Sequence, residues 1–243
     1  MRMLGTFALI GTAVLLVGGV GAWWSTLPHS SGEQAAAVLP VVQRSAVADV
    51  AADASRPTSA PGRTVATPLM PADLVSPSWL AATAARTGIP ARALQAYAGA
   101  AIVSETRNPG CRLGWNTLAG IGEEESAHGT AAGAHLGDDG VESGAIVGPR
   151  IAAGPARGDR ALGPMQLLPS TWARYGVDAD GTGAASPDNI DDAALAAADY
   201  LCVAGGDLST SAGWAAAVHA YNPDDAYVAA VRSAATRYAQ LAA

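Results

Sequence analysis

Residues 115–129 read Trp-Asn-Thr-Leu-Ala-Gly-Ile-Gly-Glu-Glu-Glu-Ser-Ala-His-Gly, and they join an apolar helical pattern to a dense polar cluster. Helical spacing places Leu118 and Ile121 on one inward face. We expect the helix to begin near Trp115 and to end near Gly129. The polar cluster then falls at the end of a helix whose other face is buried.

The polar end of this stretch holds three consecutive carboxylates, Glu123, Glu124 and Glu125. They point about 100° apart on a helix, so only one of them can enter a given cleft. Like charges and partial burial raise the pKa of that carboxyl. Glycosidic cleavage needs such a group, because the leaving oxygen must receive a proton near neutral pH. On spacing alone, however, a solvated acidic turn is the stronger interpretation.

Two later segments also carry polar groups beside helix ends. Residues 163–172, Gly-Pro-Met-Gln-Leu-Leu-Pro-Ser-Thr-Trp, place Gln166 before a short helix that Ser170 can cap. Tyr221 and Asn222 end another helix, where the phenol and the amide can both reach a cleft. The alternatives are ordinary loop packing for Gln166, a core position for Tyr221 and a C-cap for Asn222.

From residue 73 onward the spacing of Pro, Gly and helix-capping residues is typical of a series of helices. No convincing strand pattern appears, and residues 130–162, rich in Gly and Asp, are expected to form a long loop. We therefore predict an all-α domain over residues 73–243. Its further helices are expected to start at Pro90, at Asp188 or Asn189, at Ser211 and after Asn222-Pro223.

The chain begins with an apolar segment that predicts export. Met3 to Trp24 comprises 22 residues without a charge, and a helix of that length spans about 33 Å, close to the roughly 30 Å of a bilayer core. We predict an uncleaved signal anchor over residues 1–26, with a cleaved signal as the alternative. Residues 27–72, rich in Ala, Pro, Ser and Thr, are expected to be a disordered linker. The domain would then lie in the cell envelope, outside the cytoplasm, or be secreted if the segment is cleaved.

Charge and cysteine content narrow the partners and the compartment. From Asp73 onward 18 acidic residues face 10 Arg, a net charge of −8, with no Arg cluster. Nucleic-acid binding is therefore not expected, and a neutral or mixed-charge polymer is the more plausible partner. Cys111 and Cys202 are the only cysteines. In an exported domain this even count favours a disulfide over two buried thiols.

The sequence offers little for a metal or a cofactor, and none is expected. Residues 178–183, Asp-Ala-Asp-Gly-Thr-Gly, resemble the start of a calcium loop. The twelfth position, which should be a bidentate acid, is Asn189. An ordinary Asp/Gly turn is the simpler interpretation. The four His are scattered without metal-ligand spacing.

Taken in order, three segments resemble the lytic transglycosylase family. They are Gly-Ile-Gly-x-x-Glu-Ser-x-x-Gly at 120–129, Gly-Pro-Met-Gln-x-x-Pro-Ser-Thr-Trp at 163–172 and Ala-Tyr-Asn at 220–222. The resemblance covers roughly residues 73–240 and is to the membrane-bound lytic transglycosylase B-like branch of actinobacteria. It implies a lysozyme-like (goose-type, SLT) helical fold with a catalytic Glu at a helix end beside a deep groove.

The resemblance also implies residue roles and a reaction. Glu125 would be the catalytic acid, Ser126 would orient it, and Gln166, Tyr221 and Asn222 would line the substrate groove. The substrate would be the β-1,4 bond between N-acetylmuramic acid and N-acetylglucosamine in peptidoglycan, cleaved to a 1,6-anhydro end without water. A muramidase-type hydrolase remains open if Asp138, Asp139 or Asp159 supplies a second carboxylate. A non-catalytic peptidoglycan-binding scaffold is the other alternative.

Overall fold

The computed structural model describes residues 70–152 and 154–243. The expected signal anchor at 1–26, and the linker as far as residue 69, lie outside the described residues. Within the described ranges, no helix has the length and apolar character needed to cross a membrane. The first described element begins at Pro71.

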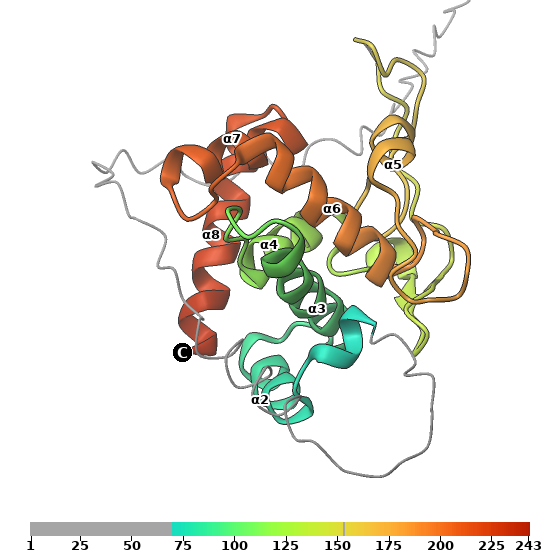
Figure 1. Cartoon of the computed structure of the whole chain (residues 1–243). Coiled ribbons are helices and arrows are strands. Elements are labelled where there is room, and N and C mark those ends of the chain that lie inside the picture. The colour runs from blue at the N-terminus through green and yellow to red at the C-terminus, as the bar shows by residue number, and fades with distance from the viewer. Residues whose placement is uncertain (1–69, 153) are drawn as a thin grey trace, which may run out of the picture. The chain divides into compact units, whose positions relative to one another are not determined.

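The described ranges are mostly helical, as expected (Figure 1). In chain order the elements are η1 (Pro71–Leu74), α2 (Pro77–Thr87), α3 (Ala91–Arg107), α4 (Trp115–Ser126), η2 (Ala131–Gly133), β1 (His135–Leu136), β2 (Glu142–Ser143), α5 (Pro169–Tyr175), α6 (Ile190–Gly205), α7 (Ser211–Tyr221) and α8 (Asp225–Ala242).

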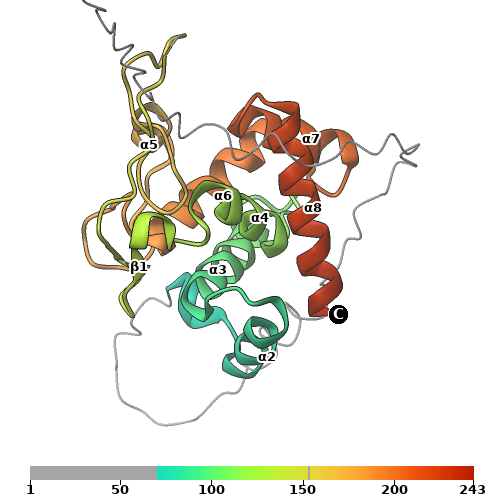
Figure 2. The same ribbon diagram turned by 180° about the vertical axis from the view of Figure 1, so that it is seen from behind.

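Helix α4 lies among the other helices and packs most extensively against α8, while α3 packs against α6 and α6 against α7 (Figures 1 and 2). Its inward residues Leu118 and Ile121 are fully buried, as the spacing predicted. The indole N–H of Trp214 on α7 donates to Thr117 on α4 at 3.0 Å, which satisfies a polar group in the core.

Two glycines allow α4 to approach its neighbours closely. A Cβ at Gly120 would lie 2.9 Å from the backbone oxygen of Val231 on α8. A Cβ at Gly122 would overlap the hydroxyl of Tyr97 on α3. Any larger residue at either position would force α4 away from a neighbouring helix.

The helix starts follow local capping rules with two corrections. Asn189 caps α6, its side chain accepting from the N–H of Asp191. The expected cap at Ser170 is wrong, because Pro169 occupies the first turn of α5 and Ser170 lies inside the helix. The expected cap at Ser211 is one residue late: the side chain of Thr210 accepts from the N–H of Gly213.

Residues 130–152 and 154–162 are mostly irregular, as predicted, but the expectation of no strands is wrong. Strands β1 and β2 pair antiparallel, with His135 opposite Ser143. Strands of two residues are too short to show an alternating pattern in a sequence. Further along, Val147 bridges Leu162, and the two chain segments beyond this bridge rise beside α5, away from the other helices (Figures 1 and 2).

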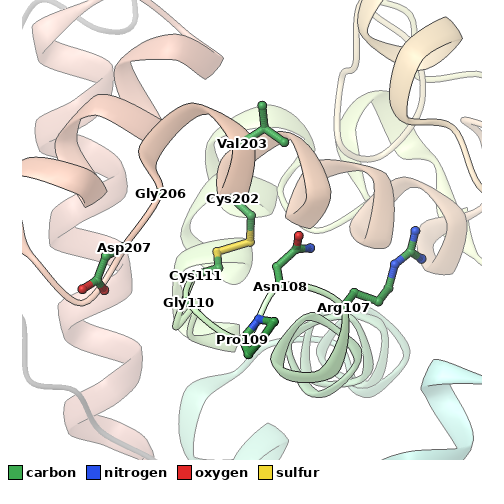
Figure 3. Close-up of a pocket in the computed structure, with 9 residues that line it drawn as sticks. All are labelled: Arg107, Asn108, Pro109, Gly110, Cys111, Cys202, Val203, Gly206 and Asp207. Atoms are coloured by element: carbon green, nitrogen blue, oxygen red, sulfur yellow. A yellow bond between two sulfur atoms is a disulfide. The ribbon is translucent and has the colours of Figure 1, made fainter.

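The predicted disulfide is confirmed. Cys111 follows α3 and is bonded to Cys202 on α6, which lies 91 positions later in the sequence. The bond lies in the wall of a pocket of about 510 Å³ at the surface (Figure 3). The lining residues are Arg107, Asn108, Pro109, Gly110, Cys111, Cys202, Val203, Gly206 and Asp207.

We predict that replacing both cysteines by Ser lowers the free energy of unfolding by about 4–5 kcal/mol. The disulfide closes a long loop and so lowers the conformational entropy of the unfolded chain, and the variant loses this effect. Denaturant unfolding of the full chain measures the difference. Reductant should destabilise the wild type and leave the double variant unchanged. Equal stability of the two proteins would contradict the expectation.

Candidate active site

Glu125 lies in the last turn of α4 and is held by a tyrosine from α8. The hydroxyl of Tyr227 donates to Oε1 of Glu125 at 2.6 Å. Burial raises the pKa of Glu125 to about 7; the Tyr227 hydrogen bond lowers it and the charge of Glu124 raises it further. Burial disfavours the charged carboxylate, and its effect outweighs that of the hydrogen bond. Glu125 is therefore a carboxyl that is half-protonated near neutral pH.

The two neighbouring glutamates have different surroundings. Glu123 forms an ion pair with Arg237 of α8 at 2.6 Å. Burial, followed by the charge of Glu123, raises the pKa of the partly exposed Glu124. Glu125 accepts the hydroxyl of Tyr227, whereas Glu123 interacts with the hydroxyl of Tyr238. That only one of the three enters a cleft stays a prediction.

The end of α4 is tied to the segment at 163–172 by a buried serine. The hydroxyl of Ser126 donates to the backbone oxygen of Pro164 at 2.6 Å and accepts from the N–H of Gly129 at 2.7 Å. Between these residues, Ala127 and His128 adopt left-handed backbone angles, with φ of 49° and 62°. Such angles cost roughly 1–2 kcal/mol for each non-glycine residue, so the surrounding contacts must hold them.

Gln166 stands on the same segment, and its amide supports the loop. Its Nε2 donates to the backbone oxygens of Ile146 and Gly163, each at 2.8 Å. Its own φ is 46°, another left-handed angle. Within the described ranges Oε1 has no hydrogen-bond partner. The expected sugar contact by Gln166 would therefore use this oxygen as an acceptor.

Tyr221 reaches the same segment from the end of α7. Its hydroxyl donates to the backbone oxygen of Met165 at 2.6 Å. Burial raises its pKa, and the charge of nearby Glu125 contributes. Its ring is 5.7 Å from that of Tyr200, which lies 5.3 Å from Tyr175, so three partly exposed rings form a row. Aromatic rows of this kind can pack against the apolar faces of sugars.

Asn222 occupies the C-cap of α7 and is partly exposed. The structure therefore agrees with the C-cap alternative for its backbone. Of the expected site residues, hydrogen bonds link Ser126, Tyr221 and the segment that carries Gln166, and Glu125 lies beside Ser126 in sequence. The contacts of the described residues do not tie the Asn222 side chain to this group.

Tyr227 was not expected at the site. Helical spacing from Asp225 onward favours an inward position for Tyr227, and the residue is buried. A buried tyrosine normally finds a partner for its hydroxyl. The sequence could not show that this partner is Glu125, which lies 102 residues earlier.

Glu142 is a second buried acid that sequence analysis did not single out. It lies in β2 and is 8% exposed, its Oε1 accepting from the N–H of Ile146 at 2.7 Å. Its Oε2 is buried without a partner in the described ranges. Burial raises the pKa of Glu142, while the Ile146 hydrogen bond lowers it. Through Ile146, this carboxyl is connected to the loop that carries Gln166.

The Asp/Gly turn brings carboxylates together that the sequence pattern did not predict. Asp178, Asp180 and Asp192 have oxygens within 4.8 Å of one another. The oxygens of Asp192 accept from three backbone N–H groups, and Asn189 donates to Asp180 at 2.7 Å. These bonds fold the turn onto the start of α6. The expectation that no metal binds stays a prediction.

Residues 152–242 match the model of the transglycosylase SLT domain. The match supports an enzyme of the lytic transglycosylase family that acts on peptidoglycan, and the helical architecture is consistent with a lysozyme-like fold. Gln166, Tyr221 and Tyr227 lie within the matched residues, whereas Glu125 precedes them. No curated protein and no solved structure matches the chain.

We predict that Glu125→Gln is stabilising relative to the wild type at pH 8 and nearly neutral at pH 4.5. The pKa of Glu125 is raised from 4.5 to about 7 on folding. Between pH 4.5 and about 7 this carboxyl is therefore ionised in the unfolded chain but still protonated in the folded protein, so wild-type stability falls as pH rises. The loss is about 3 kcal/mol. Unfolding free energies at both pH values measure it, with the exposed Glu105→Gln as control. A pH-independent difference would contradict the raised pKa.

Proposed function

We propose that residues 73–243 form a lytic transglycosylase domain that cleaves the β-1,4 bond between N-acetylmuramic acid and N-acetylglucosamine in peptidoglycan. The observation that carries the proposal is Glu125, a carboxyl with a pKa of about 7 at the end of α4. Its neighbour Ser126 is bonded to the segment at 163–172, which lies in the matched SLT region.

In the first step, protonated Glu125 donates its proton to the leaving glycosidic oxygen as the bond from C1 breaks. The N-acetyl carbonyl of the substrate stabilises the positive charge at C1. Glu125 is then a carboxylate, and the hydroxyl of Tyr227 stabilises it through a charge-assisted hydrogen bond.

In the second step, the Glu125 carboxylate takes the proton of the C6 hydroxyl while the C6 oxygen bonds to C1. A 1,6-anhydro ring closes, Glu125 regains its proton, and no water is consumed. One carboxyl therefore serves as acid and then as base. Binding would use Oε1 of Gln166, the exposed part of the Tyr221 ring and the Asn222 amide.

A muramidase-type hydrolase is the second candidate, and a specific observation favours naming it. A hydrolase of this kind needs a second carboxylate to act as a nucleophile or to activate water. Glu142 is buried, lies in the loop after α4 and keeps one oxygen without a partner in the described ranges. It is a better candidate for that role than the Asp138, Asp139 and Asp159 considered from sequence.

We further propose that residues 1–26 anchor the chain in the membrane and that residues 27–72 form a spacer, with the catalytic domain outside the cytoplasm. The disulfide supports this placement, because such bonds persist in oxidising compartments. The net negative charge of the domain fits a polymer substrate better than nucleic acid.

We predict that the full chain releases anhydro-muropeptides from purified peptidoglycan and that Glu125→Gln reduces their yield by at least about a thousandfold, because the amide cannot donate the required proton. Mass spectrometry of the products is the measurement. Glu124→Gln is the matched control and should keep activity within a few-fold of the wild type.

Other product masses decide between the alternatives. If the products carry reducing ends and disappear in both Glu125→Gln and Glu142→Gln, the protein is a hydrolase and not a transglycosylase. An absence of products from the wild type, with retained binding to peptidoglycan, would favour the scaffold. An active Glu125→Gln variant would remove this residue from the mechanism altogether.

We predict that Tyr227→Phe lowers kcat about ten- to a hundredfold, because the carboxylate loses a charge-assisted hydrogen bond. The same bond lowers the pKa of Glu125, so its loss raises that pKa. The reaction needs protonated Glu125, and the decline of kcat/KM at alkaline pH should move to higher pH. A shift to lower pH in the measured profile would contradict the role of Tyr227.

A further inference from the structure

A buried imidazole lies directly beyond the end of α4. His128 is the third residue after Glu125, and only 7% of it is exposed. Its Nε2 is 2.9 Å from the hydroxyl of Tyr238 on α8, and its Nδ1 is 3.4 Å from the hydroxyl of Tyr97 on α3. One side chain therefore connects the end of α4 with two neighbouring helices.

The ring is held in its neutral form. Burial lowers the pKa of His128 to about 4; the charge of Glu123 opposes this effect, and that of Arg237 adds to it. Glu123 and Arg237 are paired with each other. A neutral imidazole has one N–H donor and one acceptor nitrogen. His128 thus donates to one tyrosine and accepts from the other. The Tyr238 hydroxyl also hydrogen-bonds Glu123, so it accepts from the N–H at Nε2, and Nδ1 accepts from the Tyr97 hydroxyl.

The backbone that follows the last turn of α4, at Ala127 and His128, most needs support from its surroundings. Ala127 and His128 are both left-handed, and the N–H of His128 donates to the oxygen of Gly122 at 2.8 Å. Gly122 in turn lies directly against Tyr97, where no side chain would fit. Ring and backbone together hold this end of the helix against α3 and α8.

Two attachments follow Glu125 directly in the chain. Ser126 binds the end of α4 to the loop at Pro164, and His128 binds it to α3 and α8. A carboxyl that must meet a glycosidic oxygen and then a C6 hydroxyl depends on accurate placement. If either attachment were lost, the last turn of α4 would be free to shift.

We propose that His128 is a positioning residue for Glu125: by bridging the hydroxyls of Tyr97 and Tyr238, it holds the left-handed end of α4 and with it the catalytic carboxyl. The inference rests on the proposed function of Glu125 as acid and base. His128 touches neither Glu125 nor substrate in this account, and it acts only through the geometry of the helix end.

The test uses His128→Phe in the full chain, which keeps a buried ring and removes both hydrogen bonds. We expect kcat on peptidoglycan to fall about 10- to 100-fold, as misplacement of a catalytic group does, with KM within about twofold of the wild type. Glu125 would become better solvated, and its pKa would fall because burial is the main cause of its rise. The alkaline decline of kcat/KM should therefore move to lower pH. Tyr227, Tyr221 and Glu124, which also act on this carboxyl, are unchanged.

His219→Phe is the matched control, because it makes the same substitution at an exposed position on α7 and should leave the kinetics unchanged. His128→Gln should restore part of kcat, since its amide carries both a donor and an acceptor. If His128→Phe does not fold, Tyr97→Phe and Tyr238→Phe each remove one hydroxyl. Each should lower kcat and shift the pH profile in the same direction by a smaller amount.

A lower melting temperature with unchanged kcat and pH profile would overturn the proposal, because His128 would then serve stability alone. A rise in KM at constant kcat would overturn it as well. The Glu125→Gln variant distinguishes failure of the His128 positioning role from failure of the proposed function of Glu125. If that variant is inactive while the His128 and tyrosine variants keep wild-type kcat, only the positioning role fails. If it is active, the proposed function fails first.

Discussion

The close approach of α4 to α3 and α8 is the constraint on which the candidate site depends. Gly120 and Gly122 remove the side chains that would otherwise separate these helices. Only at this distance can Tyr227 of α8 reach the carboxyl of Glu125. The glycines therefore act on the chemistry indirectly, since they set how deeply the carboxyl is buried and which hydroxyl it meets.

Burial and hydrogen bonding act on Glu125 in opposite directions, and their balance suits an acid that must also be a base. Desolvation alone would keep the carboxyl protonated, and the hydroxyl of Tyr227 alone would favour the carboxylate. With both present, the pKa lies near 7, where the cost of moving a proton in either direction is small.

Contacts from distant parts of the chain support the site. The segment at 163–172 is bound by Ser126 at the end of α4 and by Tyr221 at the end of α7. Gln166 uses its amide nitrogen to fasten this segment to Ile146, whose N–H is bound by Glu142. The irregular region after α4 is therefore a structural support for the candidate site, and it also carries Glu142, a buried acid that a hydrolytic mechanism could use.

The sequence by itself determined the helical class, the approximate starts of α3, α4, α6, α7 and α8, the inward face of α4 and the pairing of the two cysteines. The helices follow from residue spacing and capping, which depend on short stretches of sequence. The disulfide follows from the expected oxidising compartment, which applies to the whole chain. The caps at Ser170 and Ser211 failed by a residue or two because Pro169 and Thr210 competed for the same helix starts. Only the tertiary structure decided that Tyr227 meets Glu125 and that His128 joins three helices. It also decided that Glu142 is buried and that Asp192 approaches Asp178. Neither helical periodicity nor capping names the partner of a buried side chain, because pairing across a core depends on how whole helices and loops pack.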